Sequence, residues 1–210
     1  VPESGQVAVH LFPMNRQADS LNDLRLNQIM MEAHGFHAES SGQASLVERL
    51  KKNMLAPEHL VLKIGAAVMA LRNDPDRQFV NGSLGTVRGF ADERKGGWPI
   101  VEFENGNIVT MKQATWEMMD GDAVLASVKQ VPLRCAWAIT IHKSQGMTLD
   151  SAVMDLHRTF APGMGYVALS RVESLSGLYL EGVNERMFLV SPDAVQLDGL
   201  LRSDSAGASE

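Results

Sequence analysis

The sequence predicts an α/β domain that is interrupted by a small β-barrel. Near both ends of the chain, short apolar runs alternate with helical patterns, as in domains built on a parallel sheet. Between them, short and partly alternating apolar runs recur at about ten-residue spacing, which is typical of a small barrel. A length of 210 residues suits one domain with an insert. We expect the α/β domain at residues 1–60 and 131–200, the barrel at 61–130 and a disordered tail at 201–210.

The N-terminal part is expected to begin with a strand and to continue into helices. Residues 7–12 form an apolar run that Pro13 ends, which indicates a buried strand. Asp19 or Ser20 is a suitable cap for a helix that continues to about His34. The other elements expected before residue 60 are a polar connection at 38–46 and a short helix at 45–53.

The middle of the chain carries the barrel pattern. Turn-forming sequences separate its apolar runs, and Asn81-Gly82 is the clearest of them, because glycine accepts the positive φ of a tight turn. A further strand is expected over 125–131, after which Pro132 returns the chain to the α/β domain. The other barrel strands are expected at 61–64, 67–71, 85–90, 100–103 and 107–111.

The C-terminal part supplies the remaining elements of the α/β domain. Residues 136–141 are apolar, and residues 151–156 indicate a central strand. Residues 164–172 predict a helix and residues 177–183 a further strand. The polar composition after residue 201 predicts the disordered tail.

Composition restricts the classes of function. Hydrophobic residues make up 45% of the chain and charged residues 21%, as in a globular protein with a core. No apolar run reaches the ~18 residues of a membrane helix, so no membrane partner is expected. The net charge of −6 argues against a freestanding nucleic-acid binder, so a DNA contact would use a local groove. The single Cys135 favours a reducing compartment, and the six histidines show no metal-ligand spacing.

The most specific segment is His142-Lys143-Ser144-Gln145-Gly146-Met147-Thr148, which follows a strand-like apolar run. A strand end that opens into a loop presents backbone N–H groups and short hydroxyls, which bind phosphates without base preference. Lys143 adds positive charge, Gln145 adds a donor and an acceptor, and Gly146 lets a ligand approach the backbone. A solvated turn would have the same composition.

A second segment, Tyr166-Val167-Ala168-Leu169-Ser170-Arg171, ends a predicted helix with an arginine. A lone arginine in this position is most often a favourable charge at the helix C-terminus. Its planar guanidinium would also suit a phosphate group. The residues alone leave both interpretations open.

Together, the two segments resemble two motifs of superfamily-one DNA helicases of the PIF and RecD-like branch. In that family the first motif contacts single-stranded DNA and couples this contact to the bound nucleotide. The resemblance implies DNA contacts by four residues and nucleotide contacts by two. The DNA contacts are His142, Lys143, Ser144 and Thr148, and the nucleotide contacts are Gln145 and Gly146.

The second motif implies a catalytic role for Arg171. In the family, the equivalent arginine is a finger whose planar fork stabilises charge on the γ-phosphate in the transition state. The family's usual Ala-Thr after this arginine is replaced here by Val172-Glu173-Ser174. This difference lies outside the arginine itself.

Two further segments extend the resemblance. Leu11-Phe12-Pro13-Met14-Asn15-Arg16 is similar to the segment after the first strand of this helicase domain, where many members have threonine in place of Met14. This implies nucleotide contacts by Asn15 and Arg16, although a charged helix N-terminus would account for both residues equally well. Residues 80–87 resemble the entry into an SH3-like subdomain, where Asn81 is a candidate DNA contact besides its role in the turn.

The sequence lacks the phosphate loop Gly-x-x-x-x-Gly-Lys-Ser/Thr and the acidic pair that helicases use for ATP and Mg²⁺. The resemblance therefore implies the C-terminal lobe of such a helicase. Its fold would be a RecA-like second motor domain, with a parallel sheet and flanking helices, interrupted by an SH3-like β-barrel insert. ATP and Mg²⁺ would be bound mainly by the N-terminal motor domain of the same polypeptide. The start Val1-Pro2-Glu3-Ser4 is expected to begin a fragment, and this chain alone is expected to hydrolyse no ATP.

The implied function is ATP-driven 5′-to-3′ movement on single-stranded DNA, in the cytoplasm and at the bacterial nucleoid. Two alternatives remain open. A RecD-like interaction module of a conjugative relaxase or recombination complex would share the fold without an active ATP site. A peptide-binding SH3 module would need an exposed aromatic groove. The sequence upstream of Val1 would separate a motor from the interaction module.

Overall fold

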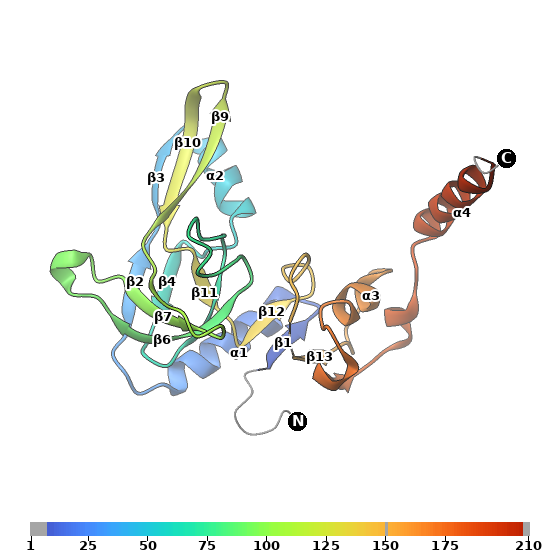
Figure 1. The fold of residues 1–210 in the computed structure, drawn as a ribbon, viewed down its shortest axis with the longest axis horizontal. Coiled ribbons are helices and arrows are strands. Elements are labelled where there is room, and N and C mark those ends of the chain that lie inside the picture. The colour runs from blue at the N-terminus through green and yellow to red at the C-terminus, as the bar shows by residue number, and fades with distance from the viewer. Residues whose placement is uncertain (1–7, 150, 208–210) are drawn as a thin grey trace. The chain divides into compact units, whose positions relative to one another are not determined.

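The computed structural model describes residues 8–149 and 151–207, with only the backbone described for 202–207. The chain forms two compact units. Unit 1 comprises the chain up to Ala18 and from Ile139 onwards, and unit 2 comprises Asp19–Ala138. Figure 1 shows the elements of both units, coloured along the chain.

Unit 1 is built on a four-stranded sheet with the order β12 (Ala138–Thr140), β1 (Val9–Phe12), β13 (Ala152–Asp155) and β14 (Leu178–Gly182). β1 pairs with β13 in parallel, and β13 pairs with β14 in parallel. Val9, Leu11 and Met154 are fully buried, as expected for strands inside a parallel sheet. The predicted mixed α/β class with a parallel sheet is therefore confirmed. Val7, which the prediction included in the first strand, lies outside the described residues.

Two helices contain or adjoin the predicted site residues. α1 (Asn15–Gln28) follows β1, begins in unit 1 and continues into unit 2, and α3 (Met164–Leu169) lies in unit 1 after β13. α3 ends before the predicted residue 172, because the N–H of Arg171 donates to the carbonyl oxygen of Ala168 at 3.0 Å in a tightened last turn. The short helical turns η2 (Leu175–Gly177) and η3 (Glu185–Phe188) flank β14.

The last helix, α4 (Pro192–Gly207), corrects the prediction of a disordered tail from residue 201. Pro192 suits the first helical position, because its missing N–H has no helical partner there, and Asp193 in the first turn is favourable next to the helix dipole. Once a helix has begun, each further residue adds a backbone hydrogen bond, so polar residues continue it. Residues 208–210 lie outside the described residues.

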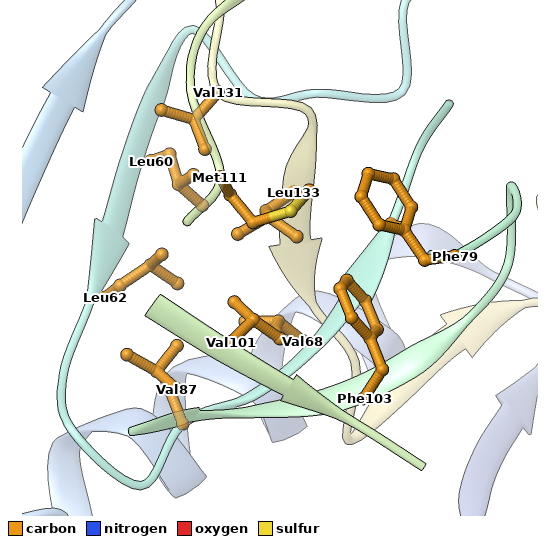
Figure 2. Packing of buried hydrophobic residues seen from close by; sticks show 12 residues of the cluster. Leu60, Leu62, Val68, Phe79, Val87, Val101, Phe103, Met111, Val131 and Leu133 are labelled. Carbon is orange, nitrogen blue, oxygen red and sulfur yellow. The ribbon is translucent and has the colours of Figure 1, made fainter. Parts of the chain in front are cut away.

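Unit 2 contains a five-stranded sheet in the order β11 (Leu133–Cys135), β5 (Ala67–Ala70), β6 (Leu84–Phe90), β7 (Pro99–Phe103) and β8 (Ile108–Thr110). All its pairings are antiparallel. Four of these strands coincide with predicted barrel runs, whereas β11 was not predicted. Figure 2 shows the core of this unit, in which Leu62, Val68 and Val101 point toward one another and are fully buried. The name SH3-like for this part remains a prediction.

Unit 2 also contains two smaller sheets and the helix α2 (Ala44–Asn53). β3 (Glu39–Gly42), β10 (Ala123–Gln130) and β9 (Ala114–Asp120) form an antiparallel sheet, and β2 (His34–His37) pairs with β4 (His59–Leu62). α2 confirms the helix predicted at 45–53. Its buried Val47 and Leu50 pack with Ala126 and Val128 of β10.

Two predictions between residues 19 and 46 are wrong. The helix expected to reach His34 ends at Gln28, and residues 34–37 form β2 instead. Residues 39–42, expected in a polar connection, form β3 against β10. In both cases the strand pairs with residues distant in the sequence, and such pairing overrides local propensity.

These pairings also change the division of the chain. They join residues 34–60 to the strands of the insert, so the compact units divide after Ala18 and after Ala138. The predicted divisions after residues 60 and 130 differ from these. The insert therefore comprises more of the chain than its barrel pattern indicated.

The single cysteine is a packing residue of unit 2. Burial raises the pKa of the Cys135 thiol to about 12, although the neighbouring Arg134 lowers it and Asp23 raises it further. A thiol with so high a pKa reacts slowly, because the thiolate is the reactive form. Within the described residues, no helix combines the length and apolar character needed to cross a bilayer.

Candidate functional site

Residues 141–146 form a tight turn directly after β12, and the segment 142–148 extends two residues beyond it. The Ser144 N–H donates to the carbonyl oxygen of Thr140 at 3.0 Å, and the Ser144 hydroxyl donates to that of Ile141 at 2.8 Å. The Ser144 side chain has no exposed surface. The predicted DNA contact by this side chain is therefore not supported, because its hydroxyl is used inside the turn.

The other polar side chains of this segment are accessible. His142, Gln145 and Thr148 are exposed, and Lys143 is half-buried. Gly146 has a φ of 81°, and a Cβ added there would meet open space, so a ligand can approach the backbone at this position. The structure thus leaves five of the six predicted contacts of this segment accessible.

Arg171 connects this turn to the second motif. Its Nη1 donates to the carbonyl oxygens of Ser144 at 3.4 Å and Met147 at 3.1 Å. Its Nε donates to the carbonyl oxygen of Val167 at 2.9 Å, and its Nη2 donates to the Ser170 hydroxyl at 2.7 Å. These bonds use four of the five N–H donors of the guanidinium. The half-buried Arg171 therefore positions the turn, which the sequence did not predict.

The backbones of the two motifs are joined as well. The N–H of Leu149 donates to the carbonyl oxygen of Arg171 at 2.7 Å, and Leu149 and Val172 form a parallel bridge. Two segments that the sequence shows only as separate patterns therefore form one site.

Close packing holds α3 in this arrangement. Gly165 is buried, and a Cβ added there would lie against the backbone of Met187 in η3, with the Met187 carbonyl carbon at 2.8 Å. Only glycine allows α3 and η3 to approach this closely. The packing sets the position of α3, whose C-terminus carries Arg171.

A pocket of about 400 Å³ opens beside the turn in unit 1. The imidazole of His142 and the ring of Phe160 lie 6.4 Å apart, with their planes at 34°. Arg16 is exposed on α1 and is not among the lining residues. The side chains that line the pocket include Met14, Asn15, Thr140, His142, Lys143 and Phe160.

The pocket suits a nucleotide or a DNA strand better than a metal ion. Its polar side chains carry amide, hydroxyl, imidazole and ammonium groups, which bind bases and phosphates. None is a carboxylate, the ligand that Mg²⁺ prefers in proteins. Among the described side chains, residues 8–149 and 151–201, no three His, Cys, Asp or Glu residues are grouped in a way that could hold a metal ion. The lining of this pocket therefore does not fit a Mg²⁺ site.

Asn81 lies in unit 2, not with the other predicted contacts. The N–H of Ser83 donates to the carbonyl oxygen of Val80 at 3.0 Å, and Gly82 has a φ of 93°. The N–H of Asn81 donates to Oδ1 of Asn73 at 2.8 Å. The predicted role in a turn with positive φ is therefore confirmed at Gly82, while a DNA contact by the exposed Asn81 side chain stays a prediction.

The sequence reading missed three residues of interest. Thr140 and Phe160 line the pocket. In the sequence, Phe160 could have been noticed as an aromatic residue inside a polar loop. Arg134 is only 9% exposed, and its Nε and Nη1 have no hydrogen-bond partner among the described residues. Burial lowers the pKa of Arg134, and Asp19 partly opposes this. In the sequence, Arg134 could have been noticed as a charged residue inside an apolar run.

Comparison with known proteins identifies relatives over nearly the whole chain. Residues 45–90, in unit 2, match the family described as DNA helicase Pif1, 2B domain. The ATP-dependent DNA helicase Pif1 of Bdellovibrio bacteriovorus is 38% identical over 195 residues, which are 90% of this chain and 44% of that protein. The human ATP-dependent DNA helicase PIF1 is 38% identical over 199 residues, which are 94% of this chain and 30% of that protein. The chain thus spans less than half the length of these relatives.

Solved structures show the same relationship. Pif1 helicase from Candida albicans superposes with a TM-score of 0.80 and 32% identity, over 96% of this chain and 51% of that one. Bacteroides Pif1 in complex with ADP-AlF3 and single-stranded DNA superposes with a TM-score of 0.69 and 27% identity, over 100% of this chain and 47% of that one.

Proposed function

Because this chain belongs to the Pif1 helicases over nearly its whole length, we propose that it is the lobe of an ATP-dependent DNA helicase that holds single-stranded DNA and completes the nucleotide site. Its relatives are described as ATP-dependent DNA helicases, and related structures contain single-stranded DNA. One observation carries the proposal. The guanidinium of Arg171 binds the carbonyl oxygens of Ser144 and Met147, so a group suited to phosphate is bonded to a turn suited to a DNA strand.

The proposed mechanism assigns a task to each part of this site. His142, Lys143 and Thr148 contact the DNA backbone from the accessible face of the 142–148 segment, and Gln145 and Gly146 face the nucleotide. Arg171 acts as the arginine finger. In this mechanism Arg171 turns toward the γ-phosphate when the lobes close on ATP, before the chemical step, and so releases its bonds to the turn. The nucleotide state then changes how DNA is held. The N-terminal motor domain binds ATP and Mg²⁺, and alternate closing and opening of the two lobes moves the strand 5′-to-3′.

The alternatives are less well supported. The relatives reported above are described as ATP-dependent helicases, which does not favour a RecD-like interaction module without motor activity. A peptide-binding SH3 module would leave the bond between the 142–148 segment and Arg171 without a role. On the proposed function, the 210-residue chain alone hydrolyses no ATP, because it contains no phosphate loop.

Replacing Lys143 by alanine tests the DNA contact. The chain is expected to bind single-stranded DNA weakly, with a dissociation constant of about 10⁻⁴–10⁻⁶ M at physiological salt, because it carries a net charge of −6. Lys143→Ala should weaken binding and make the slope of log affinity against log salt shallower by about one unit. Fluorescence anisotropy of a labelled oligonucleotide over a salt series measures both quantities.

The matched control is Arg186→Ala, which removes an exposed positive charge from η3 of the same unit, away from the pocket lining. Its salt slope should equal that of the unchanged chain. An unchanged slope for Lys143→Ala would place this lysine off the DNA and would remove the phosphate contact from the proposal.

A further inference from the structure

Phe160 is an exposed aromatic residue on a well-anchored loop. It directly follows Thr159, and 54% of its surface is accessible. Thr159 is only 2% exposed, and its hydroxyl donates to the carbonyl oxygen of Leu156 at 2.7 Å. The side-chain amide of Asn184 donates to the carbonyl oxygens of His157 at 2.7 Å and Thr159 at 3.0 Å. These bonds hold the backbone beside Phe160, so its outward position is built into the loop.

The surroundings of Phe160 combine apolar and polar groups. Its ring lies 6.4 Å from the imidazole of His142, at an angle of 34°. Both residues line the pocket of about 400 Å³, together with Met14, Asn15, Thr140 and Lys143. All these residues belong to unit 1. The volume lies within the range of small-molecule sites in proteins, which extends from about 300 to 1,000 Å³.

This combination matches the chemistry of a single nucleotide within a strand. A nucleobase has a planar face for stacking on Phe160 and polar edges for the exposed amide of Asn15. The phosphate beside the base carries the charge that complements Lys143. A peptide could also pack an apolar side chain on the ring of Phe160, but it carries no phosphate that would need the charge of Lys143.

We propose that Phe160 and this pocket hold one unpaired base of the bound DNA strand. The inference rests on the proposed function, and it adds a base contact to a site otherwise described through phosphates. Because every base has a stacking face, the contact is tolerant of sequence. It anchors one nucleotide while the phosphates on either side pass over the 142–148 segment.

The test compares a dT oligonucleotide of about ten nucleotides with an abasic strand of the same length and charge. The 210-residue chain should bind the dT strand about tenfold more tightly than the abasic strand. Phe160→Ala should remove this preference by weakening only dT binding, and its salt slope should stay unchanged. Phe160→Trp should keep the preference, because tryptophan retains a stacking face.

Phe188→Ala is the matched control, since Phe188 is 73% exposed in the same unit and does not line the pocket. It should leave the preference for dT intact. Thermal melting of each variant shows that the exposed substitutions leave the fold in place.

Three outcomes would overturn the inference. If Phe160→Ala weakens binding of the dT and abasic strands equally, the residue only shapes the loop. If the preference for dT persists in Phe160→Ala, no base contacts this ring. If Phe160→Ala instead weakens ATP binding by the complete helicase and leaves the dT preference unchanged, the pocket holds the adenine of the nucleotide. If Lys143→Ala still weakens DNA binding and lowers the salt slope as expected, any of these three results would leave the proposed function standing. If the chain binds no DNA, both the proposed function and this inference are wrong.

Discussion

On the proposed function, Arg171→Lys in the full-length protein is expected to lower DNA-stimulated ATP turnover by about 10³-fold. Lysine keeps the positive charge but loses the planar fork that binds a phosphate through two parallel hydrogen bonds. The loss should appear in kcat more than in the apparent ATP affinity, because the contact matters most in the transition state. Steady-state ATPase assays over a range of ATP concentrations, at saturating DNA, separate the two quantities.

DNA affinity is a second quantity to measure for the same variant. Arg171 also holds the carbonyl oxygens of Ser144 and Met147, and lysine cannot replace all of these bonds. Ser170→Ala is the control, since it removes only the hydroxyl that accepts from Nη2 and leaves the guanidinium in place. That control should keep turnover within a few-fold of the unchanged protein. If Arg171→Lys lowers DNA affinity strongly while kcat stays near normal, Arg171 positions the turn and is not a finger.

Gly165→Ala is expected to destabilise unit 1 by about 2–3 kcal/mol. The added methyl group would overlap the Met187 backbone, whose carbonyl carbon would lie 2.8 Å away, so α3 and η3 must move apart. The usual preference of helices for alanine over glycine, about 1 kcal/mol, offsets only part of this strain. Because α3 carries Arg171 at its end, DNA binding should weaken together with stability. Urea unfolding followed by circular dichroism measures the change.

The control is Gly199→Ala in α4, where an added Cβ would meet no atom within 4 Å. Here alanine should be neutral or should stabilise the helix by up to about 1 kcal/mol. The two variants make the same chemical change in two helices and differ mainly in packing. Equal stability of the two would show that α3 and η3 can separate at little cost.

Local patterns identified the elements in which burial of one face imposes a period on the residues. The partly alternating apolar runs at β6 and β7 were correctly predicted as strands for this reason. β2 and β3 were missed, because their sequences, His-Gly-Phe-His and Glu-Ser-Ser-Gly, have little strand character. Their partners β4 and β10 determine their conformation.

The sequence by itself was enough to predict the family. The string from His142 to Thr148 and the arginine at 171 carried the resemblance to Pif1-type helicases, and their hydrogen-bonding and charged groups are the basis of the proposed contacts with DNA and nucleotide. Only the tertiary structure decided how the groups are arranged. It buried the Ser144 hydroxyl, bonded Arg171 to the 142–148 segment and placed Phe160 beside His142. The physical reason is that a hydrogen bond or a ring contact depends on distance in space, and residues far apart along the chain leave no local pattern that records it.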